Sequence, residues 1–149
     1  MNKAILAISI AAGLVAAGAV YAEPYTDWTP QKGAWHVTTI RVDPNHVDDY
    51  LTGLKREWAP GEELAKKHGI IDQYIILVKL NSGAGANVQL IEHYPLLANL
   101  EPDKARDQAM QKEGEAMVSK ETALKAVEGF EKYRTFVSDE FWTTVEFTK

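Results

Sequence analysis

Two histidines lie within short segments dense in β-branched, aromatic and aliphatic residues, His36 in residues 35–42 and His93 in residues 88–94. An imidazole in apolar surroundings can take a proton from a phenol or an enol near neutral pH, and it can also bind a haem iron. His93 is the first candidate for a catalytic base and His36 is the second. The alternative for each is a structural histidine whose ring nitrogens are satisfied by hydrogen bonds.

Further residues could orient a substrate beside such a base. A mostly apolar pocket with a few polar groups suits an aromatic or polyketide-like ligand. The candidates lie on predicted strands or on the first predicted helix, and they are Tyr74, Tyr94, Trp142, Trp58 and Arg41. The alternative is a core role for the aromatic residues and a surface or ion-pair role for the arginine.

Glu92 and His93 follow one another on a predicted strand. Successive side chains of a strand point to opposite faces, so these two cannot serve one site together. Two histidines without a suitably spaced carboxylate make a poor metal site, and a chain without cysteine offers no thiolate ligand. We therefore expect no metal and no cofactor, with haem binding as the alternative.

The elements that must position these residues begin with a strand over residues 35–42, where β-branched and aromatic residues are dense. Asp43 followed by Pro44 predicts a helix start, with the aspartate as cap and the proline in the first turn. An apolar stripe at helical spacing runs from there to Trp58. A further helical segment ends at Gly69, a residue suited to a left-handed helix terminus.

The second half of the chain repeats this alternation of strands and helices. Residues 70–80 and 88–94 predict two strands joined by a glycine-containing turn, which makes a hairpin. Helices are predicted over residues 103–118 and 123–133. Residues 141–147 alternate aromatic or β-branched side chains with polar ones and predict the fourth strand.

The order strand, helix, strand, strand, helix, strand is that of an α+β, ferredoxin-like split βαβ fold with a four-stranded antiparallel sheet. Its helices cover one face of the sheet. Several of the predicted strands are apolar on both faces, and such a sheet must be covered twice. A second copy of the chain would supply that cover, which predicts a homodimer.

Residues 35–147 resemble the dimeric α/β-barrel superfamily. The resemblance is carried by Val42-Asp43-Pro44 after the first strand, by the hairpin, and by Glu92-His93-Tyr94-Pro95 leading into a helix-rich stretch. It implies a barrel formed by two ferredoxin-like sheets. The superfamily includes cofactor-free monooxygenases, haem proteins, lactone isomerases, polyketide cyclases and stress-response proteins, so the implied fold does not select a reaction.

Two departures from that pattern stand out. The stretch 96–119 is longer than a minimal member needs and could form a lid or a pocket wall. Residues 1–22 have the pattern of a secretory signal peptide, with Lys3 ahead of an apolar run and the small residue Ala22 at the expected cleavage site. We expect cleavage after Ala22 and a periplasmic location, because the apolar run is shorter than the roughly 20 residues of a membrane span.

The rest of the chain divides into an extended N-terminal arm, residues 23–34, and one domain, residues 35–149. The formal net charge is −5, and cleavage after Ala22 would remove one further positive charge. This acidity disfavours binding to nucleic acid or to an anionic membrane surface. The absence of cysteine excludes disulfides and a lipid-modified cysteine anchor.

Together these features predict an exported homodimer that binds a small apolar or aromatic molecule. The enzyme version is cofactor-independent acid–base chemistry of a lyase, isomerase, cyclase or monooxygenase type. The alternatives are ligand binding without turnover, including haem binding, and a structural dimer whose barrel is packed solid.

Overall fold

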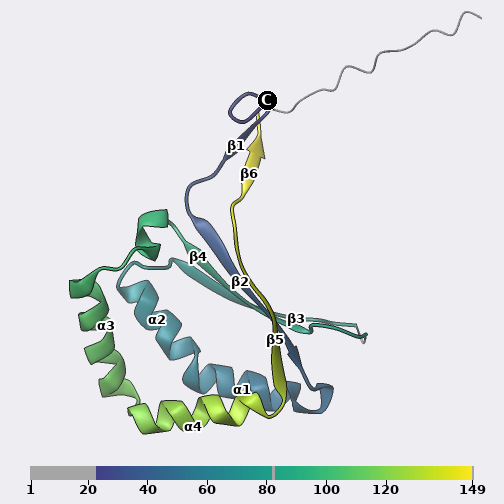
Figure 1. Cartoon of the computed structure of the whole chain (residues 1–149), viewed down its shortest axis with the longest axis vertical. Helices are drawn as coiled ribbons and strands as arrows, with labels where there is room; N and C mark the ends of the chain where they lie inside the picture. The colour runs from purple at the N-terminus through teal and green to yellow at the C-terminus, as the bar shows by residue number, and fades with distance from the viewer. Residues whose placement is uncertain (1–22, 82, 149) are drawn as a thin grey trace, which may run out of the picture.

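The computed structural model describes residues 23–81 and 83–148. Its main sheet is antiparallel and has the strand order β3-β4-β2-β5 (Figure 1). The strands are β2 (Ala34–Val42), β3 (Gln73–Val78), β4 (Val88–Tyr94) and β5 (Arg134–Trp142). This is the strand order of a split βαβ unit, so the predicted ferredoxin-like α+β fold is confirmed.

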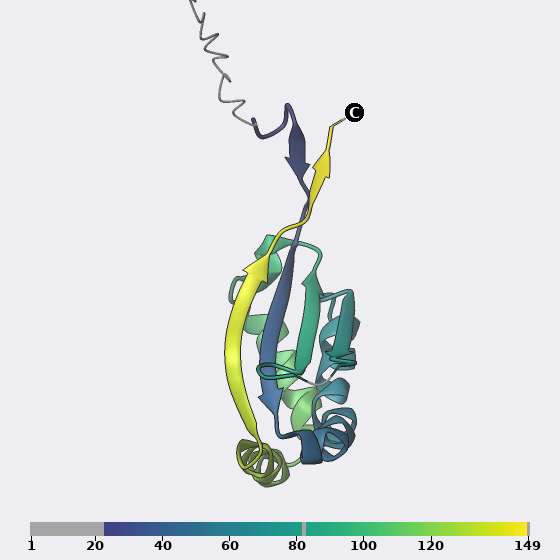
Figure 2. The ribbon, with the colours of Figure 1, turned by 90° about the vertical axis from the view of Figure 1, so that its right-hand side faces the viewer.

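Two pairs of helices connect these strands. The first pair, α1 (Val47–Glu57) and α2 (Ala59–Lys67), follows the short 3-10 helix Pro44–His46 and joins β2 to β3. After a second 3-10 helix, Leu97–Leu100, the helices α3 (Lys104–Met117) and α4 (Lys120–Glu131) join β4 to β5. The helices lie behind the sheet in Figure 2, and none of the helices in the described residues covers its other face.

The predicted helix ends are found where the local chemistry places them. The Asp43 side chain accepts a hydrogen bond from the backbone N–H of Asn45, and Pro44 follows in the first turn. Gly69, just after α2, has a φ of 69°, a left-handed conformation that glycine adopts without strain. The stretch 96–119 contributes α3, which packs beside α2 through the ion pair between Lys67 and Glu113.

We call the covered side of the sheet the helix face and the other side the open face. On β2 and β4 the helix face carries His36, Thr38, Ile40, Val42, Val88, Leu90 and Glu92. The open face carries Trp35, Val37, Thr39, Arg41, Gln89, Ile91 and His93. This assignment follows from the strand alternation and from the core, in which four of the helix-face residues are buried.

The buried core lies at one end of the helix face. Ile40, Val42, Val88 and Leu90 pack there against Tyr50 and Leu54 of α1 and Phe130 of α4. Tyr50 and Ile40 are fully buried. At the other end of the face, around His36, the strand residues are polar or aromatic and only partly buried.

The predicted position of the fourth strand was wrong. The strand in the sheet is β5, which begins at Arg134, whereas Val145–Phe147 forms β6 and pairs with β1 (Trp28–Pro30) in a separate two-stranded ribbon. β5 is an edge strand with mostly exposed side chains, so polar residues are tolerated at its middle. These polar residues interrupt the hydrophobic pattern from which a strand is predicted. Figures 1 and 2 show the ribbon projecting beyond the end of the sheet.

The predicted signal peptide, residues 1–22, lies outside the described residues. Within residues 23–81 and 83–148, no helix has the length and apolar composition that crossing a membrane requires.

Candidate functional site

Three strands bring a cluster of polar side chains together on the helix face. In the strand register His36 of β2 lies opposite Glu92 of β4 on one side and Phe141 of β5 on the other. The Nδ1 of His36 is 2.9 Å from the Oε2 of Glu92. The stacked ring of Phe141, with its centroid 4.6 Å from that of His36, fixes the plane of the imidazole.

The second nitrogen of the same ring is also bound to a carboxylate. The Nε2 of His36 forms a short hydrogen bond with Asp139 of β5, and the hydroxyl of Thr38 donates to the same carboxylate over 3.3 Å. An imidazole donates from both nitrogens only when it carries both protons and a positive charge. The arrangement therefore favours the charged form of His36.

The balance of burial and charge at His36 supports the same conclusion. Burial by itself lowers the pKa of a histidine, because it disfavours the charged form. Here the hydrogen bonds and negative charges of Glu92 and Asp139 outweigh burial, and the pKa of His36 is raised above its usual value. The side chains of His36 and Glu92 are 19% and 14% exposed, whereas that of Asp139 is 68% exposed. The cluster thus reaches from the interior to solvent.

Tyr94 completes the cluster on the β4 side. Its hydroxyl donates to the Oε2 of Glu92 over 3.3 Å. Burial, followed by the charge of Glu92, raises the pKa of Tyr94 to about 12, so the hydroxyl remains a donor near neutral pH.

Glu62, in the first turn of α2, is near enough to this cluster for the charges of Glu92 and His36 to act on its carboxyl group. Burial is the main reason that the pKa of Glu62 rises to about 7, and the negative charge of Glu92 adds to the rise while His36 opposes it. Glu62 therefore exchanges its proton near neutral pH, a range in which most glutamates are fully ionised.

A cleft of about 300 Å³ runs along the helix face from Glu92 toward the core. Its walls are mostly apolar, with four polar side chains among them, and it is open to solvent on one side. The lining residues are Thr38, Leu54, Glu57, Trp58, Leu90, Glu92, Phe130, Arg134 and Phe136. Glu92 belongs both to the cleft and to the His36 cluster, so it connects the two.

The structure distributes the predicted site residues between the two faces. His36, Tyr94 and Trp58 lie at the cluster or the cleft, and the ring of Tyr74 packs edge-on against that of Trp58 at 5.3 Å. Their open-face counterparts are His93, Trp142 and Arg41.

On the open face, His93 has its own carboxylate partner. Its Nδ1 is 2.6 Å from the Oδ1 of Asp72, and its ring centroid is 4.5 Å from that of Trp35. Trp142 lies opposite Trp35 in the register and is 57% exposed. Glu92 and His93 are on opposite faces, as the strand alternation requires.

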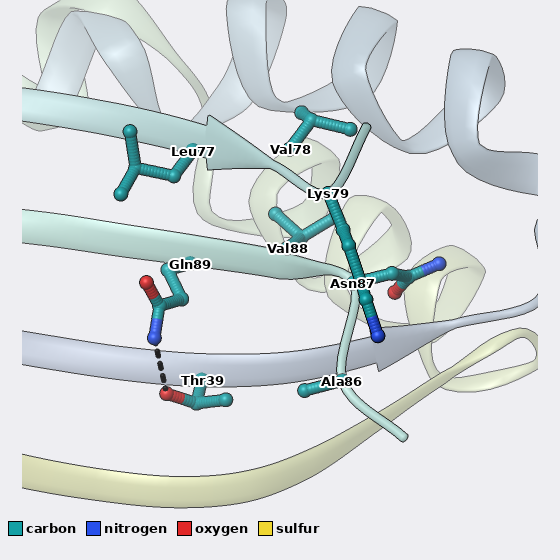
Figure 3. A pocket seen from close by; sticks show the side chains of 8 residues that line it. All are labelled: Thr39, Leu77, Val78, Lys79, Ala86, Asn87, Val88 and Gln89. Carbon is teal, nitrogen blue, oxygen red and sulfur yellow. Dashed lines mark hydrogen bonds between the residues drawn. The ribbon is translucent and has the colours of Figure 1, made fainter. Parts of the chain in front are cut away.

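A second hollow, of about 280 Å³, lies at the turn end of β3 and β4 (Figure 3). Figure 3 shows Gln89 and Thr39 joined by a hydrogen bond, which is 3.3 Å long, and the extended side chain of Lys79 passing Asn87. None of its lining residues is a histidine or a carboxylate. We therefore place the candidate site at the cleft and the His36 cluster.

Asp139 and Glu62 of the site were not among the sequence candidates, whereas Arg134, like Arg41, is by residue type able to hold a carboxylate or to form a surface ion pair. Asp139 lies on a strand that the hydrophobic pattern did not reveal, and Arg134 is the first residue of that strand. Glu62 belongs to an ordinary charged helical turn, and no sequence signal distinguishes it from its neighbour Glu63. These residues join the site through contacts between distant segments.

The cluster is not arranged to hold a metal ion. Within the described ranges, His, Asp and Glu side chains form no group of three or more with that geometry. The reason at His36 is that Glu92 and Asp139 bind opposite nitrogens of the ring, so the three side chains do not converge on one point.

No family model matches the chain, and no curated protein matches it significantly. Among solved structures it is similar to HapK from Hahella chejuensis, with 12% identity and a TM-score of 0.43 over 73% of this chain and 90% of that one. It is also similar to a dimeric ferredoxin-like protein of unknown function from Bacteroides fragilis, with 12% identity and a TM-score of 0.41 over 80% and 100% of the two chains.

A third similar structure is a dimeric ferredoxin-like protein from an uncultured marine organism, with 13% identity and a TM-score of 0.42 over 79% of this chain and 91% of that one. The fold assignment of the present chain rests on its own strand order and pairing.

Proposed function

We propose that this protein binds a small apolar or aromatic molecule in the helix-face cleft and exchanges a proton with it. The observation that carries the proposal is the continuous chain of contacts Glu92–His36–Asp139. Glu92 lines the cleft, and Asp139 is largely exposed to solvent. Such a chain supplies a route for a proton between a bound ligand and bulk water without a cofactor.

Each transfer in this route balances. When the ligand is a ketone or a phenol, Glu92 takes a proton from carbon or oxygen and the ligand becomes an enolate or a phenolate. The relay runs through the neutral His36 ring that carries a proton on Nε2 alone. This ring takes the proton from Glu92 on Nδ1 and becomes the charged form, and the charged ring then releases its Nε2 proton through Asp139 to water. The reverse sequence returns a proton to the ligand, so the net reaction is a tautomerisation or an exchange with solvent.

The apolar walls of the cleft support the ligand class. Trp58, Phe130 and Phe136 offer aromatic surface, and Leu54 and Leu90 complete the lining. Exclusion of water along such walls strengthens the electrostatic effect of each charged group in the cleft. The alternative function is binding of a ligand, including haem, without turnover.

Proton exchange on a simple ketone tests this proposal. The probe is 2-tetralone, a flat bicyclic ketone whose α-protons are replaced by deuterium in D₂O through its enol, and ¹H NMR follows the replacement. We expect the wild-type protein to accelerate the exchange, and Glu92→Gln or His36→Asn to reduce the acceleration by at least roughly 100-fold. His46→Asn, which alters an exposed histidine paired with Asp49, is the matched control.

Two other outcomes have definite meanings. Binding of 2-tetralone without accelerated exchange would refute proton transfer and favour the binding protein. If the protein neither binds 2-tetralone nor accelerates its exchange, the hypothesis of a structural dimer is the one that remains.

We also propose that the chain forms a homodimer through the open face. Exposed apolar side chains on or beside that face include Trp142, Leu77 and Val137, which are 57%, 48% and 57% exposed. A second copy would cover them, and the pairing of two identical faces gives a closed two-fold assembly.

The predicted location also belongs to the proposal. The segment 1–22 is proposed to be cleaved after Ala22 during export to the periplasm. N-terminal sequencing of protein purified from periplasmic extract should begin at Glu23, and a start at Met1 would contradict this location.

A further inference from the structure

Arg134, the first residue of β5, is held among aromatic rings at the core end of the cleft. The carbon at the centre of its guanidinium lies 4.8 Å from the ring centroid of Phe136, 5.1 Å from that of Phe130 and 5.9 Å from that of Tyr50. Aromatic faces attract a guanidinium, which remains charged at every physiological pH. These rings therefore hold the charge in place without neutralising it.

The hydrogen bonding of this guanidinium is incomplete. The Nε of Arg134 is buried without a hydrogen-bond partner, and the nearby hydroxyl of Tyr50 is also buried without one. Burial raises the pKa of Tyr50 above its usual value, and hydrogen-bonding and charge interactions with Arg134 oppose part of that rise. The Tyr50 hydroxyl is thus close to the guanidinium, although no hydrogen bond of good geometry joins it to Nε. Within the described residues, no carboxylate lies within ion-pair distance of Arg134, whereas Arg56 and Arg106 are paired with Glu57 and Asp107.

Arg134 lines the same cleft as Glu92. In the register Arg134 lies opposite Val42, and Glu92 lies opposite His36, so their backbones are separated by about 20 Å along β2. Despite this separation, Arg134 lines one cleft together with Thr38 and Glu92. Of the residues that line the cleft, Arg134 is the only base, and the carboxylate of Glu57 is bound by Arg56.

We propose that Arg134 binds the anionic group of the cleft ligand, which makes the ligand class an apolar, flat carboxylate such as an aromatic acid. This inference rests on the proposed function for the location of the ligand, and it adds the ligand's charge and orientation. The carboxylate would accept hydrogen bonds from the guanidinium at the core end. The apolar body would lie against Trp58 and Leu90 and extend toward Glu92.

Two properties of the site favour a carboxylate over a neutral ligand. A guanidinium donates two parallel hydrogen bonds to a carboxylate, and this geometry selects planar anions. A buried donor without a partner is unfavourable, so a ligand that supplies an acceptor to Nε gains affinity that a neutral analogue lacks.

The test compares two probes that differ in charge. The first is 2-naphthoate and the second is 2-acetonaphthone, in which a neutral acetyl group replaces the carboxylate. Isothermal titration calorimetry measures the dissociation constant of each for the wild type, for Arg134→Met and for the control Lys112→Met, which removes a charge from an exposed position on α3. ¹H–¹⁵N NMR follows the Nε–H of Arg134 in the wild type.

We expect Arg134→Met to raise the dissociation constant of 2-naphthoate by roughly 10-fold to 100-fold. It should change that of 2-acetonaphthone by less than about twofold, and Lys112→Met should leave both nearly unchanged. Only 2-naphthoate should shift the Nε–H resonance. Arg134→Lys, which keeps the charge without the planar donor pair, should give an intermediate value.

Equal weakening of both probes by Arg134→Met would overturn the proposal, because it would reveal a packing role. An Nε–H resonance that does not respond to 2-naphthoate would overturn it without any variant. The calorimetric and NMR measurements of 2-naphthoate binding do not depend on proton exchange of 2-tetralone. Failure of the proton-transfer proposal can therefore be distinguished from failure of the proposal for Arg134.

Discussion

His36 and His93 lie on opposite faces of one sheet and are equally accessible, with side chains 19% and 21% exposed. Each ring has a carboxylate on Nδ1, Glu92 for His36 and Asp72 for His93. The difference lies in the other neighbours. His36 has a second carboxylate on Nε2 and borders the cleft, whereas His93 stacks on Trp35 of the open face.

Residue type and exposure therefore do not distinguish the two histidines. A proton route needs groups on both sides of the ring, one toward a ligand and one toward water. The helix face supplies both because three strands contribute to one cluster there. The open face supplies one partner and a broad apolar surface, which suits association with another protein surface.

The largest effect is expected from breaking the open face. Trp142→Asp places a charge in the proposed dimer interface and should raise the dimer dissociation constant at least about 100-fold, or about 3 kcal/mol. Phe136→Asp is the matched control, since Phe136 is 58% exposed, as Trp142 is 57% exposed, but lies on the helix face. Light scattering over a dilution series measures the mass of each variant.

If both variants become monomeric, or if neither does, the dimer interface cannot be assigned to the open face rather than to the helix face. If the wild-type protein is monomeric at every concentration, the proposal of a homodimer is refuted.

An effect of intermediate size is expected from Glu62, whose carboxyl group is influenced by the charges of Glu92 and His36. Because its pKa in the folded protein is raised to about 7 from 4.5, the folded state binds more protons between these pH values. The stability from this proton is fully present below pH 4.5 and is lost as the pH rises through 7. Glu62→Gln should therefore be more stable than the wild type at pH 8 by about 1–2 kcal/mol, after allowance for solvent screening.

Urea unfolding at pH 4 and pH 8 measures this difference. At pH 4 the two proteins should have similar free energies of unfolding. Glu128→Gln, on the exposed surface of α4, should stay within about 0.5 kcal/mol of the wild type at both pH values. A stability gain of Glu62→Gln that does not depend on pH would contradict the explanation.

The smallest expected effect is a change in the pKa of His36, with little change in the stability of the fold. Asp139→Asn removes one of the two negative charges at the ring, so the pKa of His36 should fall toward or below its usual value. Asp72→Asn makes the same change beside His93 and should leave His36 unaffected. NMR of the imidazole Cε1–H signals against pH reports each histidine separately.

The linked stability has a defined sign. A raised pKa at His36 stabilises the fold below the unfolded value of 6.5, and this stabilisation is lost as the pH rises through the folded value. Asp139→Asn should therefore reduce the stability difference between pH 6 and pH 8. If the titration of His36 is unchanged in Asp139→Asn, the conclusion that Asp139 interacts with the imidazole is contradicted.

Much of the fold could be predicted because its signals are local. Asp43 and Pro44 begin the first helix, Gly69 follows the second, and the hairpin strand Val88–Tyr94 has the predicted bounds. Capping, proline geometry and strand alternation act over a few residues, so the sequence displays them directly. The fourth strand was misplaced because its central residues are exposed and polar, which weakens the hydrophobic pattern of an edge strand.

Part of the candidate site was predictable for a similar reason. Tyr94 and Glu92 are two residues apart on one strand, so they share a face, and His93 must point to the other side. The role of Asp139 was not predictable, because it lies 103 residues from its partner His36. The register between β2 and β5 shifts between Thr39 and Ile40, which leaves Val137 without a partner on β2. This bulge places both Phe136 and Asp139 on the helix face.

Local signals in the sequence were enough for the alternation of strands and helices, for the helix caps and for the relative orientation of neighbours along each strand. The face of the sheet that the helices cover, and with it the histidine that borders the cleft, depends on long-range packing. Strand alternation assigns residues to two faces but does not indicate which face the helices will cover. Strands that are apolar on both faces lack the polar–apolar contrast that would indicate it. The pairing of distant strands and the packing of α1 and α4 on Ile40 and Val42 settle that choice.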